Sequence, residues 1–451
     1  MSHDRFTDTW VRQALMLDGA ADTGYSAIST DTRSLQPDAL FVALAGARFD
    51  AHDFLAAARD AGATGAVVRR TTPDVPGLVL YRVDDTLRAL GDLAAAHRRR
   101  FAGVVVAITG QNGKTSTKEM LAAVLGTRWR THRTRANLNN LVGVPLTILE
   151  AAPDTEALVV EAGANQPGEI ARYREIIQPD IAIVLNAGAG HLEGFGSVAA
   201  VVREKLSLTR DAPLAIVGLQ PPELAPGARA LARRVITAGL RDADVVPDGV
   251  EMAPDGRPIV TIDGERFTVG ARGRHQAGNA MFAWAVVREL GLDRAAAARA
   301  LERITIPGGR GELIQHGGLT VVNDGYNANP QSFATAIALA RDLRNGRRLV
   351  FVAGTMLELG SHAGALHREV AGWLADLAPD VLALVGDFVP AFAPFRADFR
   401  GEILEARDAE ALGPLLARRL RGNELLVLKG SRGAALERIL PPVLARAATT
   451  T

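Results

Sequence analysis

The segment from Gly110 to Ser116 (GQNGKTS) combines the groups that a phosphate-binding loop requires. The apolar run 104–108 before it predicts a buried parallel strand, and the apolar positions 120, 121, 124 and 125 after it predict a helix. Glycines let backbone N–H groups approach phosphate oxygens, and a helix N-terminus favours negative charge. We expect Lys114 to contact the terminal phosphates of a nucleotide and Thr115 to hold Mg²⁺. The candidate nucleotide-binding residues are Gly110, Gln111, Asn112, Gly113, Lys114, Thr115 and Ser116.

The loop departs from the usual spacing, because Ile108 stands where the first glycine of that pattern belongs. Short Gly-Lys-Thr strings also occur by chance in ordinary loops. The strand before this string and the helix after it favour the nucleotide interpretation.

The lysines of this chain form a second chemical signal. Among 51 lysines and arginines, only Lys114, Lys118, Lys205 and Lys429 are lysines. A lysine is a compact point charge that can lose its proton, whereas an arginine keeps its charge. A primary amine is therefore expected where a guanidinium cannot replace it. The alternative is codon bias that left a few lysines at random.

The composition limits the class of protein. A chain of 451 residues predicts two or three domains, and the net charge of +1 without a basic stripe argues against nucleic-acid binding. There is no cysteine for a disulfide and no run of eighteen apolar residues for a membrane span. The N-terminus lacks a secretory core. We expect a soluble, cytoplasmic α/β protein without a membrane or nucleic-acid partner.

Alternating strand and helix patterns predict three α/β domains, at residues 1–98, 99–308 and 309–451. The first is a small α/β domain with strands at 39–44, 65–68 and 78–81 and helices at 53–61 and 86–99. The central domain is predicted as a parallel-sheet ATPase domain with strands at 103–108, 157–161, 181–185 and 213–217, a hairpin turning at Asp263-Gly264, and a helix at 277–290.

The last domain is predicted to be doubly wound, like a Rossmann fold, after a linker at 306–311. Its expected strands are 319–323, 349–353, 381–385 and 425–428. Its expected helices are 331–344, 366–377, 408–421 and 433–446. In such sheets ligands gather at the carboxyl ends of the strands.

Several polar residues follow predicted strands and could bind a metal or ligand. Glu161, His191 and Asp324 stand at such ends, and Glu161 is a plausible Mg²⁺ ligand because that ion prefers oxygen. Each could equally be a cap or a solvated loop residue, and His191 taken alone favours a structural role. The asparagines between Asn137 and Asn140, and those of the segment 324–330, carry the same ambiguity between recognition and turn formation.

In this order and spacing, the motifs resemble those of the Mur ligases of peptidoglycan synthesis. The matching segments span nearly the whole chain: 29–33, 40–46, 109–120, 137–147, 161–165, 191–205, 275–279, 309–310, 324–330, 358–360 and 429–432. The resemblance implies a ligase that uses ATP to activate a carboxylate as an acyl phosphate, which an amine then attacks. The implied partners are UDP-N-acetylmuramoyl-tripeptide and D-alanyl-D-alanine, and the protein is expected to be a monomer.

The resemblance also implies a role for each domain. The first would bind the UDP end of the substrate through Thr32, Arg33 and Gly46, and Asn137 and Asn140 would add substrate contacts. Adenine would meet Asn279, while Arg310 and Asp324 would reach the phosphates and ribose. The implied contacts to D-alanyl-D-alanine are Tyr326, Asn327 and Asn329.

The family further implies that Lys205 is a carbamate made with CO₂ and shares Mg²⁺ with His191. The catalytic candidates are then Lys114, Glu161, His191 and Lys205, and the metal candidates are Thr115, Glu161, His191 and Lys205. Without the resemblance, Lys205 reads as an ordinary lysine on a helix surface.

Two positions depart from the family pattern, and a third bears on the choice of substrate. Ser207 stands where a glutamate usually follows the modified lysine, and Thr355 replaces an aspartate. Gln331 stands where the related diaminopimelate-adding ligase has an arginine, which argues against that amino acid as substrate. The alternatives are another ligase of the superfamily, such as folylpolyglutamate synthetase, or a nucleotide-dependent switch that does not ligate.

Overall fold

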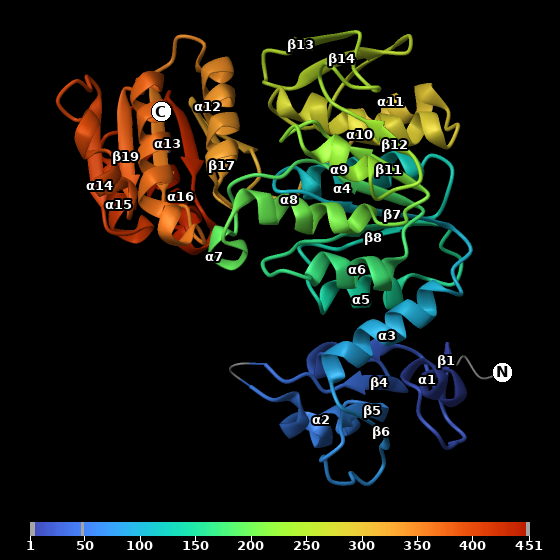
Figure 1. The fold of residues 1–451 in the computed structure, drawn as a ribbon. Helices are drawn as coiled ribbons and strands as arrows, with labels where there is room; N and C mark the ends of the chain where they lie inside the picture. Colours follow the sequence, from blue (N-terminus) through green and yellow to red (C-terminus); the bar gives the residue numbers. More distant parts are fainter. Residues whose placement is uncertain (1–4, 47–48, 448–451) are drawn as a thin grey trace.

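The computed structural model describes residues 5–46 and 49–447. The chain forms three α/β domains, and Figure 1 shows the N-terminal domain in blue below the central domain, with the C-terminal domain in orange and red beside it. None of the helices in these residues is long and apolar enough to cross a membrane.

The N-terminal domain is built on a parallel sheet in the order β3-β4-β5-β6. The strands are β3 (Ile28–Ser29), β4 (Ala39–Val42), β5 (Ala63–Arg69) and β6 (Val79–Val83). Helix α2 (Leu55–Asp60) packs on one face, whereas α1 (Asp8–Leu15) and α3 (Thr86–Arg98) pack on the other. A short antiparallel pair, β1 (Phe6–Thr7) and β2 (Gly24–Tyr25), lies beside α1.

Helix α3 joins the N-terminal and central domains. Its Asp92 accepts a hydrogen bond of 2.6 Å from Arg172, and its Arg98 donates one of 2.8 Å to the carbonyl of Ile177. Apolar residues of both domains form one continuous core cluster around this helix. The two domains are therefore held by shared burial as well as by polar contacts.

The central domain contains a six-stranded parallel sheet in the order β12-β11-β10-β7-β9-β8. The strands are β7 (Val104–Thr109), β8 (Thr131–Arg133), β9 (Ala157–Glu161), β10 (Ile181–Val184), β11 (Leu214–Val217) and β12 (Val235–Thr237). Alternate residues of β7 face opposite sides, because Val106 and Ile108 join one core cluster while Val105 and Ala107 join the other.

Helices cover both faces of this sheet. One face packs α4 (Lys114–Leu125), α10 (His275–Glu289) and α11 (Arg294–Glu302). The other packs α5 (Gly143–Glu150), α6 (Glu169–Ile177), α8 (Val198–Leu206) and α9 (Leu224–Arg229). Strand β7 lies between β9 and β10, which follow it in the chain on opposite sides. The loop after β7 therefore occupies the point where ligands bind in such sheets.

An antiparallel sheet is inserted before α10. It contains β13 (Gly249–Met252), β14 (Pro258–Ile262) and β15 (Glu265–Thr268). The turn between β14 and β15 has φ of 53° at Asp263 and 83° at Gly264, as a tight hairpin requires. The sequence predicted this hairpin and missed β13, whose residues are half-buried or exposed.

The C-terminal sheet has the order β16-β17-β21-β18-β19-β20, with the edge strand β16 antiparallel to the others. The strands are β16 (Glu312–His316), β17 (Leu319–Asp324), β18 (Leu349–Gly354), β19 (Val381–Val385), β20 (Glu402–Ala406) and β21 (Leu425–Lys429). Helices α12 (Pro330–Arg344) and α13 (Ala363–Leu377) cover one face, and α15 (Ala409–Ala417) and α16 (Leu440–Ala447) cover the other.

The prediction of one continuous helix at 433–446 was wrong. Short 3-10 turns at Arg432–Ala434 and Leu436–Ile439 precede α16, and Ala435 between them has φ of 48°. A left-handed residue interrupts a right-handed helix, so regular α-helix begins only at Leu440. The edge strands β16 and β20 were also not predicted.

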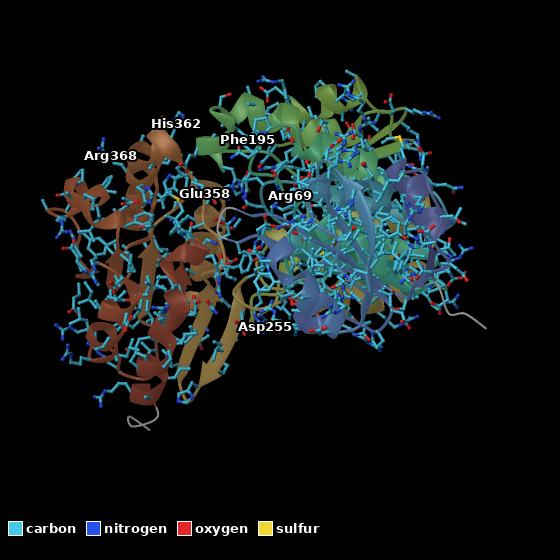
Figure 2. The ribbon with its side chains drawn as sticks, turned by 90° about the horizontal axis from the view of Figure 1, so that it is seen from below. Arg69, Phe195, Asp255, Glu358, His362 and Arg368 are labelled. Atoms are coloured by element: carbon cyan, nitrogen blue, oxygen red, sulfur yellow. The ribbon has the colours of Figure 1, made fainter. Side chains whose placement is uncertain are left out.

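The central and C-terminal domains meet at helix α7 (Leu192–Phe195). The backbone N–H of Glu193 donates to the carbonyl of Glu358 at 3.3 Å. Figure 2 shows Phe195 on one side of this junction and Glu358 and His362 on the other. His191, directly before α7, lines the pocket described next.

Candidate active site between the central and C-terminal domains

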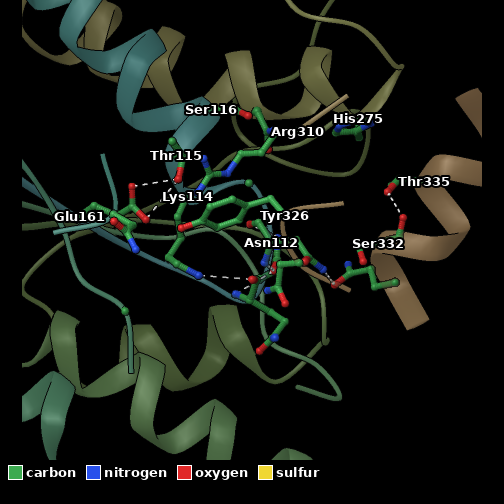
Figure 3. Close-up of a pocket in the computed structure, with 18 of the residues that line it drawn as sticks. Asn112, Lys114, Thr115, Ser116, Glu161, His275, Arg310, Tyr326, Ser332 and Thr335 are labelled. Carbon is green, nitrogen blue, oxygen red and sulfur yellow. Dashed lines mark hydrogen bonds between the residues drawn. The ribbon is translucent and has the colours of Figure 1, made fainter. Parts of the chain in front are cut away.

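A cavity of about 380 Å³ lies between the central and C-terminal domains (Figure 3). The central domain contributes the loop after β7, the asparagine segment 137–140 and the first turn of α10. The C-terminal domain contributes Arg310, the segment after β17 and Lys429. The pocket therefore unites segments that are far apart in the sequence.

The loop after β7 is shaped for close approach. Gly113 has φ of +85°, and a Cβ at this position would lie 2.7 Å from Oδ1 of Asn279. Only glycine fits both the conformation and the space. Gly113 provides no side-chain cap, so the first N–H groups of α4 remain available for an anion. This arrangement fits the phosphates of a nucleotide.

Lys114 lies over the loop. Its Nζ donates to the carbonyls of Gly110 at 2.8 Å and Gln111 at 3.3 Å. Burial lowers the pKa of Lys114, with the charge of Glu161 acting in the opposite direction and that of Arg310 adding to the shift. A nearby phosphate would favour the charged amine, so the site is suited to an anionic ligand.

Glu161, at the end of β9, lies beside the first turn of α4. Its carboxylate accepts a hydrogen bond of 3.1 Å from Thr115 Oγ1 and one of 2.8 Å from Asn139 Nδ2. The Thr115 hydroxyl and the Glu161 carboxylate are both hard oxygen donors, and Mg²⁺ needs few protein ligands. The pair therefore fits Mg²⁺, although no three His, Asp or Glu side chains converge as metal ligands in the part of the chain that is described.

The geometry places His191 next to the C-terminal domain. Its Nδ1 lies 2.5 Å from Oε2 of Glu358, and its backbone has φ of 54°. Burial lowers the pKa of His191, while the charge of Glu358 opposes this and those of Lys114 and Lys205 add to it. The partner Glu358 was not predicted from the sequence, because only the domain junction brings it to His191.

Lys205 is not an ordinary lysine on a helix surface, because only 1% of it is exposed. Burial lowers its pKa to about 7, and the positive charge of Lys114 contributes. Ser207 does not take over the role of the usual glutamate. Its Oγ instead donates to the carbonyl of Glu204 at 2.6 Å, three residues earlier in the chain. The Glu204 carboxylate instead accepts from the N–H groups of Gly168 and Ile170.

The first turn of α10 forms another wall of the pocket. Asn279 donates to Oε1 of Gln276 at 3.0 Å, and Gln276 in turn donates to Oγ of Ser116 at 3.4 Å. Burial, aided by the charge of Lys429, lowers the pKa of His275 to about 4. Gln276 and His275 were missed as site residues, although their spacing of three and four from Asn279 places them on one helix face.

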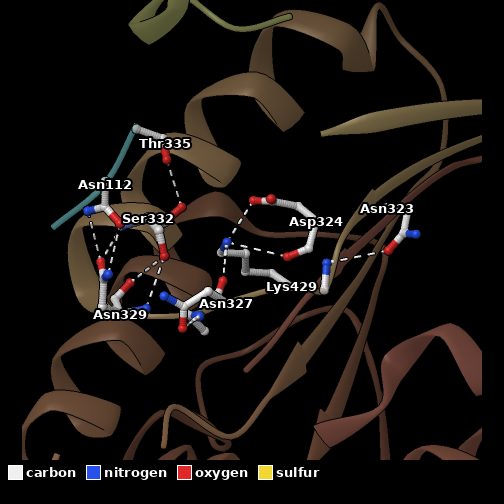
Figure 4. A network of polar contacts seen from close by, with 10 residues as sticks. Asn112, Asn323, Asp324, Asn327, Asn329, Ser332, Thr335 and Lys429 are labelled. Carbon is white, nitrogen blue, oxygen red and sulfur yellow. Dashed lines mark hydrogen bonds and ion pairs between the residues drawn. The ribbon is translucent and has the colours of Figure 1, made fainter. Parts of the chain in front are cut away.

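The C-terminal side of the pocket is formed by two neighbouring strand ends (Figure 4). Asp324 of β17 and Lys429 of β21 are in register and form an ion pair of 2.7 Å. Burial raises the pKa of Asp324, and the charge of Lys429 partly opposes the rise. Nearby, the guanidinium of Arg310 lies 3.7 Å from the ring centroid of Tyr326.

The asparagines after Asp324 serve the local fold as well as the pocket. Asn327 binds the N–H of Ala328 through its side chain and accepts from Lys429 Nζ through its carbonyl at 2.8 Å. Asn329 caps α12 by accepting from the N–H of Ser332 at 2.9 Å. Its amide also contacts Asn112 in the phosphate loop.

The other predicted substrate residues are divided between two places. Asn137 and Asn140 line the pocket, and Asn140 Oδ1 accepts from the N–H of Gly143 at 2.8 Å at the start of α5. Thr32, Arg33 and Gly46 lie in the N-terminal domain and do not line this pocket. The exposed Arg33 is paired with Asp31 at 2.7 Å.

Comparison with protein families assigns each domain. The Mur ligase family, catalytic domain, matches residues 24–98; the Mur ligase middle domain matches 108–287; and the Mur ligase, glutamate ligase domain, matches 309–432. The chain is 34% identical over 433 residues to the UDP-N-acetylmuramoyl-tripeptide–D-alanyl-D-alanine ligase of Bacillus subtilis (strain 168), covering 92% of this chain and 93% of that protein.

Solved structures agree with this comparison. A crystal structure of MurF from Acinetobacter baumannii has a TM-score of 0.89 and 30% identity, and the match covers 98% of this chain and 99% of that one. MurF ligase from Thermotoga maritima in complex with ADP has a TM-score of 0.82 and 28% identity, covering 94% and 98% of the two chains. This protein belongs to the Mur ligase family.

Proposed function

We propose that this Mur ligase joins D-alanyl-D-alanine to UDP-N-acetylmuramoyl-tripeptide and converts ATP to ADP and phosphate. The observation that carries the proposal is the pocket in which the phosphate loop faces the strand ends at Asp324 and Lys429. The name of the B. subtilis relative and the ADP complex of the T. maritima structure support the same substrates and nucleotide. We also propose that the enzyme acts in the cytoplasm.

The chemistry follows from an electrostatic problem. A carboxylate is a poor electrophile, and bound ATP supplies the phosphoryl group that turns it into an acyl phosphate. Both reactants are anions, so their approach requires positive charge. Lys114 and the N–H groups at the start of α4 are placed to supply this positive charge. Thr115 and Glu161 are placed to hold the Mg²⁺ that would add to it.

The second step joins the amine to the acyl carbon. The α-amine of D-alanyl-D-alanine has a pKa of about 8, so it needs only modest help to lose a proton. Attack forms the amide bond and releases phosphate. We propose that Tyr326, Asn327 and Asn329 contact this dipeptide, because they lie on the C-terminal side of the pocket or at the start of α12. Thr32, Arg33 and Gly46 are proposed to bind the UDP end.

Lys205 is proposed to act as a carbamate that shares Mg²⁺ with His191. CO₂ reacts with a neutral amine, and burial gives Lys205 a pKa of about 7, so a neutral fraction exists near neutrality. The buried setting fits this modification better than it fits a permanently charged ammonium. A carbamate would supply two anionic oxygens in a region that already contains Lys114.

A reconstitution assay tests the proposed function. The purified chain, Mg²⁺, ATP, UDP-N-acetylmuramoyl-tripeptide and D-alanyl-D-alanine should yield UDP-linked pentapeptide, detected by mass spectrometry, with one ADP per product. Product with a folate and glutamate instead would identify the folylpolyglutamate alternative. ATP hydrolysis without any joined product would identify the switch.

A further inference from the structure

Lys118 is a buried lysine to which the reaction above gives no role. It lies on α4, one helical turn after Lys114, and its side chain is 0% exposed. Its Nζ lies 3.1 Å from Oε1 of Glu119 and 3.8 Å from Oε2 of Glu161, and it donates to the carbonyl of Ala136 at 3.4 Å. A buried ammonium between two carboxylates needs a reason, because removing it from water is costly.

The carboxylates of Glu119 and Glu161 differ in the number of cations that lie close to them. Glu119 has a second cation, because Arg133 Nε lies 2.7 Å from its Oε2. Among the described residues, Lys118 is the one cation within 4 Å of the Glu161 carboxylate. Glu161 is also almost fully buried, so Lys118 is the partner that compensates its charge at short range.

Lys118 and Asn139 lie at different oxygens of the Glu161 carboxylate. Asn139 Nδ2 binds Oε1 of Glu161 at 2.8 Å, while Oε2 faces both Lys118 and the hydroxyl of Thr115, 3.1 Å away. By holding the carbonyl of Ala136, Lys118 is tied to the segment that carries Asn139. Lys118 and Asn139 therefore flank the carboxylate, which lies next to Thr115.

The residue type agrees with such a role. The chain uses arginine at nearly every basic position, yet retains lysine here. A guanidinium is a planar fork with five donors, whereas an ammonium is compact and can contact three acceptors from one atom. In this position, which has no exposed surface, the ammonium lies near two carboxylates and one carbonyl with a single nitrogen.

We propose that Lys118 is a positioning residue that pre-orients Glu161 as a divalent-metal ligand beside Thr115. This proposal depends on the proposed function in one respect, because that function identifies the ligand of the site as a metal-bound nucleotide. Lys118 does not contact the reacting atoms; it acts through Glu161. Its removal should weaken metal binding more than it slows turnover at saturating metal.

The test replaces Lys118 by methionine, which is similar in length and uncharged. Mn²⁺ binding to the full chain in the presence of ADP, followed by electron paramagnetic resonance, should weaken roughly 10–100-fold, as for other residues that orient metal ligands. In ligation assays the half-saturating Mg²⁺ concentration should rise by a similar factor, with kcat at saturating Mg²⁺ within about threefold of the parent. Unchanged Mn²⁺ affinity in the folded variant overturns the proposal.

Glu119→Gln is the matched control. It removes the neighbouring carboxylate but leaves the Lys118–Glu161 contact, so Mn²⁺ affinity should stay within about threefold of the parent. If it weakens binding as much as Lys118→Met, the effect comes from disturbed packing of α4 and the proposal fails. In a Glu161→Gln background, Lys118→Met should cause no further loss, because the ligand that it orients is gone.

The double variant Lys118→Met/Glu119→Gln covers the case in which the single variant does not fold. It keeps the local charge balance and lacks the contact to Glu161, so its Mn²⁺ binding should be as weak as predicted for Lys118→Met. Parent-like binding overturns the proposal. The Mn²⁺ measurement needs no ligation, so a parent enzyme that forms no pentapeptide would refute the proposed function without deciding the role of Lys118.

Discussion

Asn112 in the phosphate loop and Asn329 at the start of α12 exchange two side-chain hydrogen bonds. Asn112 Nδ2 donates to Asn329 Oδ1 at 3.2 Å, and Asn329 Nδ2 donates to Asn112 Oδ1 at 2.9 Å. Gln331 adds an acceptor for Asn112 at 2.8 Å. The nucleotide loop thus contacts the C-terminal domain directly. A ligand that moves the loop would therefore change these contacts between the two domains.

Asn329→Asp tests this junction without removing the helix cap. Aspartate still accepts from the N–H of Ser332, but it cannot donate to Asn112. Loss of one hydrogen bond of about 1 kcal/mol should raise KM for D-alanyl-D-alanine about fivefold, with little change in Tm. Steady-state kinetics and thermal unfolding check this. Asn329→Ala, which also loses the cap, should lower Tm, and equal Tm values for the two variants would contradict the cap.

Lys114→Ala should lower the rate of ligation by roughly 10²–10³-fold or more, because it removes the cation nearest the developing phosphate charge. Within the described part of the chain, the Lys114 amine donates hydrogen bonds only to carbonyls of its own loop, so the fold should survive. Circular dichroism and product formation measured on the same preparation check both expectations. Turnover near the parent rate would rule out the phosphate role.

Lys205→Ala should be inactive, and short carboxylic acids should partly restore it by supplying the missing anionic oxygens. In the parent, the amine has a pKa of about 7, so at equal concentrations of dissolved CO₂ activity should return to CO₂-depleted enzyme faster at pH 8 than at pH 6. Initial rates measured without CO₂ and with bicarbonate adjusted to give the same dissolved CO₂ at both pH values check this. An alanine variant that works unaided would show that Lys205 carries no carbamate.

The buried Asp8 makes stability depend on pH. Burial would raise its pKa, but hydrogen bonds from Tyr81, the N–H of Ala21 and Arg12 outweigh this and hold the pKa below its usual value. A lowered pKa contributes stability above about pH 4 that is lost as pH falls through the folded-state value.

Tyr81→Phe removes the hydroxyl that lies 2.6 Å from Asp8 Oδ1. It should lower the free energy of unfolding by about 1–3 kcal/mol at pH 7, with a smaller loss at pH 3.5. Urea unfolding at both pH values measures the difference. A loss of free energy of unfolding that is larger at pH 3.5 than at pH 7 would contradict this prediction. Ligation at pH 7 should be unchanged, because this pair lies outside the pocket.

Much of the fold could be predicted because its signals are local. The buried strands around β7, the turn at Asp263 and Gly264 and the phosphate loop each follow from a few consecutive residues. The edge strands β16 and β20 have partly exposed residues and therefore no clear apolar run. The break at Ala435 was missed because alanine normally favours helix, and the surrounding packing overrides that preference.

The candidate site could also be predicted only in part from the sequence. The sequence alone marked the phosphate loop, four rare lysines and the polar strand ends, since residue type and spacing carry that information. Only the tertiary structure decided that Glu358 meets His191, that Asn139 and Lys118 lie beside Glu161, and that Lys205 is buried. These contacts join residues far apart in the chain, and burial shifts a pKa only after packing has excluded water.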